Sequence, residues 1–146
     1  MKGLWIILAA VIACLGIPAS SASEPNTANQ LRKVAITFNN NYSKNSVGPV
    51  YDRWDAQSQK IITRNKYIHR HQLCATNPGA AIIGLISKIG NQYWQVHYLI
   101  DQAKLIDYWS YINGAWRFSL YKSNPDAVAL YKLSLSEYER KVGCKP

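Results

Sequence analysis

The chain has 146 residues, with 17 lysines and arginines against 8 aspartates and glutamates, and its formal net charge is +9. This length suits a single domain. A basic protein concentrates near anionic surfaces such as wall polymers, lipid head groups or nucleic acid. The basic residues form no dense run, so the charge predicts where the protein concentrates rather than what it recognises.

Residues 1–23 are typical of a signal peptide. Lys2 supplies a positive start, an almost wholly apolar stretch follows, and small residues lead to a cleavage position after Ala22 or Ser23. The apolar stretch is marginal for spanning a ~30 Å hydrocarbon layer, which takes roughly 20 residues. We therefore expect a secreted or cell-envelope protein whose mature domain, residues 24–146, keeps a net charge of about +8 once Lys2 is lost.

An alternative for the same segment attaches the protein to a membrane. The residues Val-Ile-Ala-Cys that end at Cys14 resemble a bacterial lipobox, in which cleavage before the cysteine leaves a thiol that becomes diacylated. Plain secretion and lipidation of Cys14 both stay open, and the membrane is a partner only in the second case.

Two cysteines, Cys74 and Cys144, remain in the expected mature domain. In an exported chain, two cysteines most economically pair with each other. The bridge would close a loop of roughly 70 residues, for which the chain-entropy model gives about 4 kcal/mol of stabilisation. Since no second Cys or His lies at metal-ligand spacing, we expect a disulfide and no metal site.

The first half of the mature domain is expected to be helical. After Thr27 the apolar residues follow a helical stripe, at Leu31, Val34, Ala35, Phe38 and Tyr42. A second helix would have Pro49 in its first turn and Trp54 on its apolar side, and a short helical piece would lie within residues 55–62. Thr63 is a plausible N-cap for a third helix, and the segment 75–79 breaks the chain.

Beyond this break the apolar period changes from 3.6 to 2, which indicates strands. Four antiparallel strands are predicted, over residues 80–89, 92–100, 105–112 and 115–121. Tight two-residue turns are expected at Gly90-Asn91 and at Asn113-Gly114, because these residues tolerate positive φ angles. A four-residue turn at 101–104 would join the two middle strands.

These turns assign each strand residue to one of two faces. The inner face would carry Ile83, Leu85, Trp94, Val96, Tyr98, Ile100, Leu105, Trp109, Tyr111, Trp116, Phe118 and Leu120. The outer face would carry Ile82, Ile86, Tyr93, His97, Leu99, Ile106, Tyr108, Ile112, Arg117 and Tyr121. The helices would cover the inner face, whereas the outer face is less polar than a solvent-facing sheet normally is.

Short helices are expected after the sheet. Asn124-Pro125-Asp126 combines a cap, a first-turn proline and an acidic residue, which predicts a helix through Tyr131. Ser136 and Glu139 have capping-box spacing for a last helical turn that ends at Gly143.

Several stretches carry a family resemblance. They are Val50-Tyr51-Asp52 with Ser58-Gln59 and Thr63-Arg64 in the helical half, and residues 108–118 with 123–131 in the closing half. Over residues 29–131 the chain resembles exported bacterial proteins of the NTF2-like superfamily. The resemblance implies an α+β cone, in which N-terminal helices pack on a curved four-stranded antiparallel meander and short C-terminal helices follow. Such a fold hosts transport factors, isomerases, dehydratases and cyclases, so it does not by itself imply a reaction.

Asp107 is the acidic residue that the predicted register places on the inner face, opposite Tyr98. An aspartate beside a tyrosine resembles the acid-plus-phenol pairs of isomerases with this fold, and burial would raise its pKa. The alternative is that Asp107 accepts a hydrogen bond from Tyr98 and has a structural role alone.

The histidines are expected at the surface. His69 and His71 are two residues apart and share no helix face, which argues against a metal site on that helix, and His97 belongs to the outer sheet face. The sequence also contains no supported Ser-His-Asp order, no phosphate loop and no glycosidase-type carboxylate pair.

The leading hypothesis is a non-catalytic exported domain without a cofactor. It would bind a small ligand in the cone, or an envelope protein or a second copy through Tyr93, His97, Tyr108 and Arg117 of the outer face. One alternative is an isomerase or dehydratase that uses Asp107 and Tyr98. Another is a basic binder of anionic polymer, for which no specific nucleic-acid motif is present.

Overall fold

The computed structural model describes residues 22–75 and 78–144. Its first helices are α1 (Ala28–Ser43), α2 (Val47–Asp52), α3 (Ala56–Gln59) and α4 (Arg64–Leu73). The strands β1 (Ile82–Ile89), β2 (Tyr93–Ile100), β3 (Ala103–Ile112) and β4 (Ala115–Phe118) follow. Helices α5 (Leu120–Ser123), α6 (Pro125–Tyr131) and α7 (Leu135–Val142) end the chain. The predicted signal sequence up to residue 21, with Cys14, lies outside the described residues.

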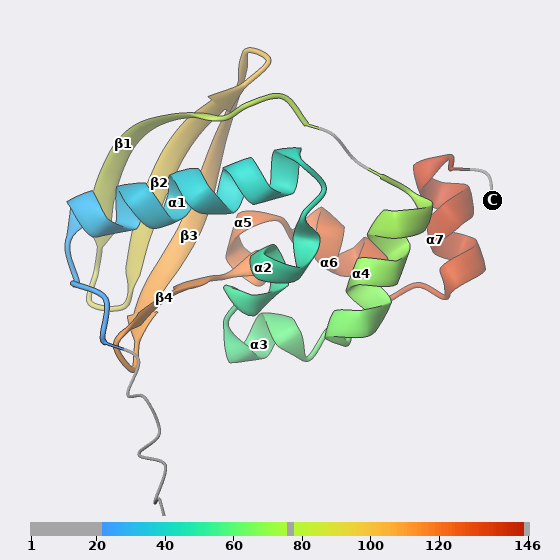
Figure 1. Ribbon diagram of the computed structural model, residues 1–146, viewed down its shortest axis with the longest axis horizontal. Coiled ribbons are helices and arrows are strands. Elements are labelled where there is room, and N and C mark those ends of the chain that lie inside the picture. The colour runs from blue at the N-terminus through green and yellow to red at the C-terminus, as the bar shows by residue number, and fades with distance from the viewer. Residues whose placement is uncertain (1–21, 76–77, 145–146) are drawn as a thin grey trace, which may run out of the picture.

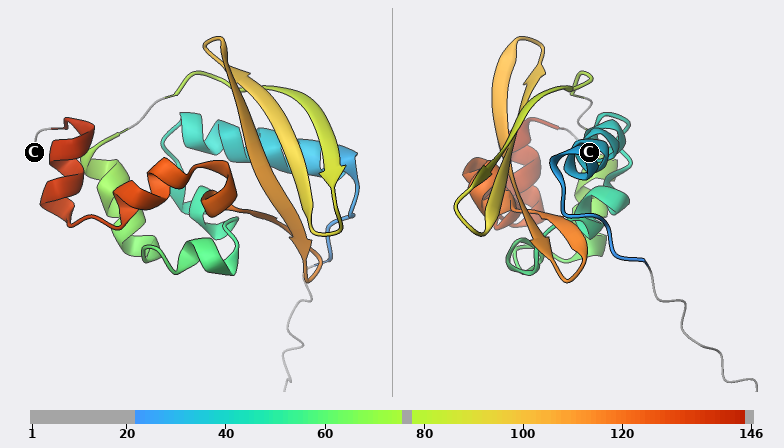
Figure 2. Two further views of the ribbon diagram at one scale, coloured as in Figure 1. Left: turned by 180° about the vertical axis from the view of Figure 1, so that it is seen from behind. Right: turned by 90° about the vertical axis from the view of Figure 1, so that its left-hand side faces the viewer.

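The four strands form one antiparallel sheet in the order β1-β2-β3-β4, so the protein belongs to the α+β class. Helix α1 lies across one face of this sheet, and α2, α4 and α6 lie beyond its end (Figure 1). Seen from behind, the strands face the viewer and none of the coloured helices crosses them (Figure 2, left). The sheet therefore has an inner face toward α1 and an outer face away from it.

The predicted starts of two helices are confirmed. The Thr27 side chain accepts a hydrogen bond from the backbone N–H of Gln30 at the start of α1, and Thr63 does the same for Lys66 at the start of α4. Each hydroxyl satisfies a backbone N–H that has no partner within the helix. The apolar stripe of α1 is buried as expected, with Phe38 near its C-terminal end.

Helix α7 begins two residues earlier than predicted. Its capping box is formed by Ser134 and Glu137, whereas Ser136 lies within the helix and is exposed. Both pairs have the required spacing, but the backbone of Ser134 is extended, as an N-cap needs, and Leu135 already belongs to the helix. The predicted end is confirmed, because Gly143 takes a left-handed φ of 73°.

The hairpin of β3 and β4 has the predicted register. Ile112 pairs with Ala115 and Tyr111 with Trp116, and the turn residues Asn113 and Gly114 have positive φ angles of 50° and 77°.

The turn between β2 and β3 is tighter than the predicted four residues. Asp101 and Gln102 both take positive φ angles, 48° and 72°, and Ile100 pairs with Ala103. The pairing is shifted by two residues, so Tyr98 lies opposite Leu105 rather than opposite Asp107. A shift of two preserves the faces, and Asp107 stays on the inner side.

Strand β1 is where the predicted faces are wrong. The connection to β2 has three residues, so Ile89 pairs with Tyr93, one residue out of the predicted register. A bulge between Ile83 and Ile86 restores the predicted pairing of Ile83 with Tyr98. Between turn and bulge each side chain changes face, so Ile86 packs against the core and Leu85 is 64% exposed.

Strand β4 ends three residues earlier than predicted. After Phe118 the chain turns into α5, and Leu120 is buried from that helix rather than from the sheet. Residues 53–55 run beside the end of β4, where the N–H of Asp55 donates to the carbonyl of Phe118 at 2.8 Å. Trp54 therefore follows α2 instead of belonging to it, and it is buried in the core.

The three sheet tryptophans share the inner face, as predicted. Trp109 and Trp116 are fully buried, and the rings of Trp94 and Trp116 lie 5.6 Å apart in an edge-on arrangement. Trp94 pairs with Trp109 across β2 and β3. The core thus lies between the sheet and the helical layer.

A disulfide joins Cys74, which follows α4, to Cys144, which follows α7. The predicted pairing is present, and a disulfide fits a protein of an oxidising, extracytoplasmic compartment. Within residues 22–75 and 78–144, no helix is both long enough and apolar enough to cross a bilayer.

Candidate functional site

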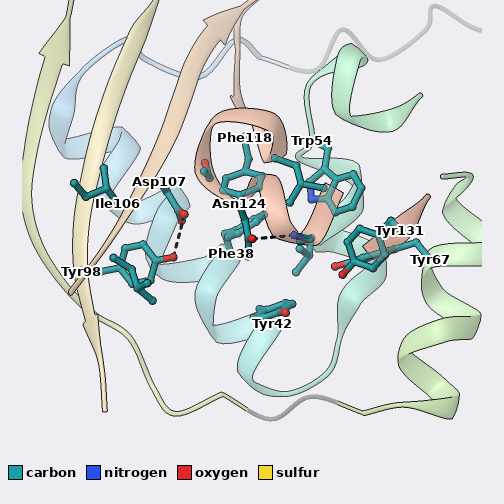
Figure 3. Close-up of a pocket in the computed structure, with 15 residues that line it drawn as sticks. Phe38, Tyr42, Trp54, Tyr67, Tyr98, Ile106, Asp107, Phe118, Asn124 and Tyr131 are labelled. Carbon is teal, nitrogen blue, oxygen red and sulfur yellow. Dashed lines mark hydrogen bonds between the residues drawn. The ribbon is translucent and has the colours of Figure 1, made fainter. Parts of the chain in front are cut away.

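A cavity of about 150 Å³ opens at the end of the inner sheet face. A dry cavity of about 150 Å³ accommodates a benzene molecule, which sets the scale of a fitting group. Seven of the lining residues are aromatic: Phe38, Tyr42, Trp54, Tyr67, Tyr98, Phe118 and Tyr131 (Figure 3). We call this space the aromatic cavity.

Residues distant in sequence converge on the aromatic cavity because each element directs one face toward it. Phe38 and Tyr42 are one turn apart on α1, so they share its inner side. Tyr98 and Asp107 come from the inner faces of β2 and β3. Ala127 of α6 faces the cavity from the opposite side.

Asp107 and Tyr98 meet at the wall of the aromatic cavity. The hydroxyl of Tyr98 donates to Oδ1 of Asp107 at 3.0 Å (Figure 3), and Asp107 is 4% exposed. The two residues are diagonal neighbours rather than directly opposed, and the long phenol bridges the difference.

Burial raises the pKa of the Asp107 carboxyl to about 7, although the hydrogen bond from Tyr98 lowers it in part. The pKa of Tyr98 is also raised, first by burial and then by the adjacent Asp107 carboxylate. Near neutral pH the carboxyl is therefore present in both protonation states while the phenol keeps its proton.

The sequence predicts His71 at the surface, but the structure places it behind the aromatic cavity. It is 1% exposed, and its Nε2 is 3.0 Å from the hydroxyl of Tyr131. Burial lowers the pKa of His71 to about 4, so the ring is neutral at neutral pH. Tyr67 and His71 are four residues apart on α4, and this spacing was the sequence signal that both share its buried face. His69 is exposed, as expected.

Arg70 holds α6 against α4. Its guanidinium donates to the backbone carbonyls of Leu130, Tyr131 and Leu133, which belong to the last turn of α6 and the residues after it. The carbonyl of Leu130 also accepts from the backbone N–H of Leu133, and the guanidinium adds a partner at this helix end, where carbonyls lack donors within the helix. Arg70 thereby fixes Tyr131 at the end of the aromatic cavity.

The four candidate residues of the outer face do not form a free cluster. The ammonium of Lys122 lies 4.6 Å from the ring centre of Tyr93, and Gln95 donates to the hydroxyl of Tyr108 at 2.9 Å. Arg117 donates to the backbone carbonyl of Asp52 at 2.9 Å. His97 is half-buried in the predicted position. Exposed apolar side chains remain on this face at Ile82, Leu99 and Ile112, whereas the exposed Ile106 also lines the aromatic cavity.

The sequence predicts Asp107 and Tyr98 at this site but not most of the other residues that line the cavity. Trp54, Tyr67 and Tyr131 fall within the predicted helices, and nothing local in the sequence distinguishes an aromatic residue in a core from one that lines a cavity. Among the residues that the structure describes, no group of His, Cys, Asp and Glu is placed to hold a metal ion. No family model, curated protein or solved structure matches the chain.

Proposed function

We propose that this protein is an exported, non-catalytic domain of NTF2-like type that binds a small ligand in the aromatic cavity. The observation that carries the proposal is a cavity with seven aromatic walls and one buried carboxyl–phenol pair. Binding sites commonly combine a largely apolar lining with a few polar groups that orient the ligand. The cavity volume suits a single ring or a similarly compact group.

Proton-transfer chemistry is the second candidate, because a carboxyl with a pKa of about 7 is suited to act as a base near neutral pH. An isomerase or dehydratase also needs a donor for the oxyanion that forms in the substrate. The hydroxyl of Tyr98 donates its hydrogen bond to Asp107 itself, so it is not available for that role. This use of the phenol favours binding over catalysis.

Two substitutions on α6 test whether the aromatic cavity is the binding site. Ala127 lines the cavity, whereas Ala129 of the same helix is exposed. Ala127→Phe should fill the cavity, and Ala129→Phe adds the same ring to the surface. We expect benzyl alcohol to bind to the wild type and to Ala129→Phe but not to Ala127→Phe. Isothermal titration calorimetry measures this binding.

Equal binding by both variants would place the ligand elsewhere. Absence of benzyl alcohol binding by the wild type would count against a small-ligand site altogether. Circular dichroism of Ala127→Phe shows whether the fold has survived the larger side chain.

A further inference from the structure

The aromatic cavity differs in charge from the rest of the molecule. The chain carries a net charge of +9, yet among the residues that the structure describes no Lys, Arg or His lines the cavity. Asp107 contributes the one carboxyl. A ligand in this space therefore meets a site that becomes negative when Asp107 ionises and has no positive side chain to offset it.

The Asp107 carboxyl has capacity for a further partner. A carboxylate accepts several hydrogen bonds, and among the described residues Tyr98 is its one donor, at Oδ1. Asp107 is only 4% exposed, and buried charges in proteins are normally paired. An ionised Asp107 would be left without a counter-charge.

Aromatic rings supply the remaining attraction that a cation needs. Tyr42, Trp54 and Tyr131 approach the cavity from α1, from the segment after α2 and from α6 (Figure 3). The face of an aromatic ring is negative, and a cation over it gains about 2 kcal/mol when both are removed from water. Quaternary ammonium groups are bound in this way by cages of aromatic side chains.

Building on the ligand-binding function above, we propose that the ligand is a small organic cation, a quaternary or substituted ammonium compound, with its charge between Asp107 and the aromatic walls. An anionic ligand would be repelled by the carboxylate, and no cation lines the cavity to bind it. A neutral carbonyl compound would bind only to the protonated carboxyl. A cation matches both the charge and the ring faces.

The positive surface of the protein opposes the approach of a cation, but weakly at physiological salt. Charges more than about 8 Å from the ligand are largely screened at 0.15 M ionic strength. The contact with Asp107 inside the cavity is screened much less, because it is partly removed from water.

The proposal predicts a pH dependence with a definite sign. The other titratable groups in or behind the cavity are Tyr42 of α1, Tyr67 and His71 of α4, Tyr98 of β2 and Tyr131 of α6. Burial raises the pKa of Tyr67, Tyr98 and Tyr131, and lowers that of His71 to about 4, so these groups keep one form between pH 6 and 8. Because Asp107 has a pKa of about 7, cation affinity should rise about tenfold over this range.

Choline and its neutral isostere 3,3-dimethyl-1-butanol provide the test, because they share shape but differ in charge. At pH 8 we expect the full-length mature domain to bind choline about 30-fold more tightly than the alcohol, measured by calorimetry. The affinity for choline should fall towards pH 6, whereas the affinity for the alcohol should not change.

Asp107→Asn should abolish the preference for choline over the alcohol. Asp101→Asn is the matched control, since it removes one negative charge from the exposed turn of the same β2–β3 hairpin. Tyr42→Leu, which removes one aromatic wall and leaves the carboxyl in place, should weaken choline more than the alcohol.

Equal affinities for choline and the alcohol at pH 8 would overturn the proposal, and so would choline binding that strengthens towards pH 6. Benzyl alcohol binding distinguishes this failure from that of the cavity itself. A wild type that binds benzyl alcohol but shows no preference for choline keeps the ligand site and rejects the cation.

Discussion

Asp107 is buried at a cost in stability. Its carboxyl has one hydrogen-bond donor, Tyr98, and lies among aromatic rings that do not stabilise a negative charge. Burial favours the protonated form, so the folded protein keeps a proton that the unfolded chain has released. A residue that weakens the fold at neutral pH is typical of a site retained for binding or chemistry.

The cost of Asp107 can be measured through its pH dependence. The pKa of an exposed Asp carboxyl is 3.8 and burial raises that of Asp107 to about 7, so its contribution to stability falls as pH rises from about 4 to about 7. We expect Asp107→Asn, which cannot ionise, to be more stable than the wild type at pH 8, by on the order of 4 kcal/mol, and close to it at pH 4. Urea denaturation at both pH values measures this difference.

Asp101→Asn is the control for the loss of charge, and its effect should be small at both pH values because Asp101 is exposed. A stability difference between wild type and Asp107→Asn that does not change with pH would contradict the buried, proton-bound carboxyl.

The hairpin of β3 and β4 could be predicted residue by residue because Asn113-Gly114 leaves few turn geometries. The two-residue turn at Asp101-Gln102 could not be predicted, because neither residue is as typical of positive φ angles as glycine is. The strand pairing therefore differs from the predicted one by two residues, a shift that leaves each side chain on its predicted face. The bulge in β1 lies at Gly84, and a lone glycine within a strand is a weaker signal than a turn dipeptide. There the error of one residue exchanged Leu85 and Ile86 between the two faces.

The aromatic cavity was predictable only in part, for a similar reason. Tyr98 and Asp107 lie on neighbouring strands, so strand periodicity places them on one face. Trp54, Tyr67 and Tyr131 reach the cavity through the packing of α2, α4 and α6, which depends on contacts between residues far apart in the chain. Local periodicity carries no information on such contacts.

Helix α7 offers a test of the corrected cap. Ser134→Ala removes the side chain that accepts from the Glu137 N–H, and it should lower the free energy of unfolding by about 1 kcal/mol. Ser136→Ala, an exposed position inside the same helix, should change it by less than about 0.5 kcal/mol. Chemical denaturation of both variants measures the difference. A larger effect at Ser136 would show that Ser136, as the sequence predicts, and not Ser134 is the N-cap.

The whole molecule combines a basic surface, an aromatic cavity and an outer sheet face with exposed isoleucines and leucine. The disulfide ties α4 to the end of the chain, and Arg70 fixes α6 on α4, so the helical side of the cavity is cross-braced. On the outer face, Tyr93, Tyr108 and Arg117 already have partners within the chain and are not free to contact a ligand. Preorganisation therefore favours the cavity as the site of ligand binding.

The most direct test of ligand binding in the aromatic cavity is an NMR titration with choline that follows methyl resonances. Both the cavity and the outer face carry methyl-bearing side chains, so the titration reports on each surface. Val50, Leu120 and Ala127 line the aromatic cavity, whereas Ile82, Leu99 and Ile112 are exposed on the outer face. We predict saturable shifts of the first three methyl-bearing residues and none of the second three. Shifts confined to the outer face, or no shifts at all, would contradict a cation-binding site in the cavity.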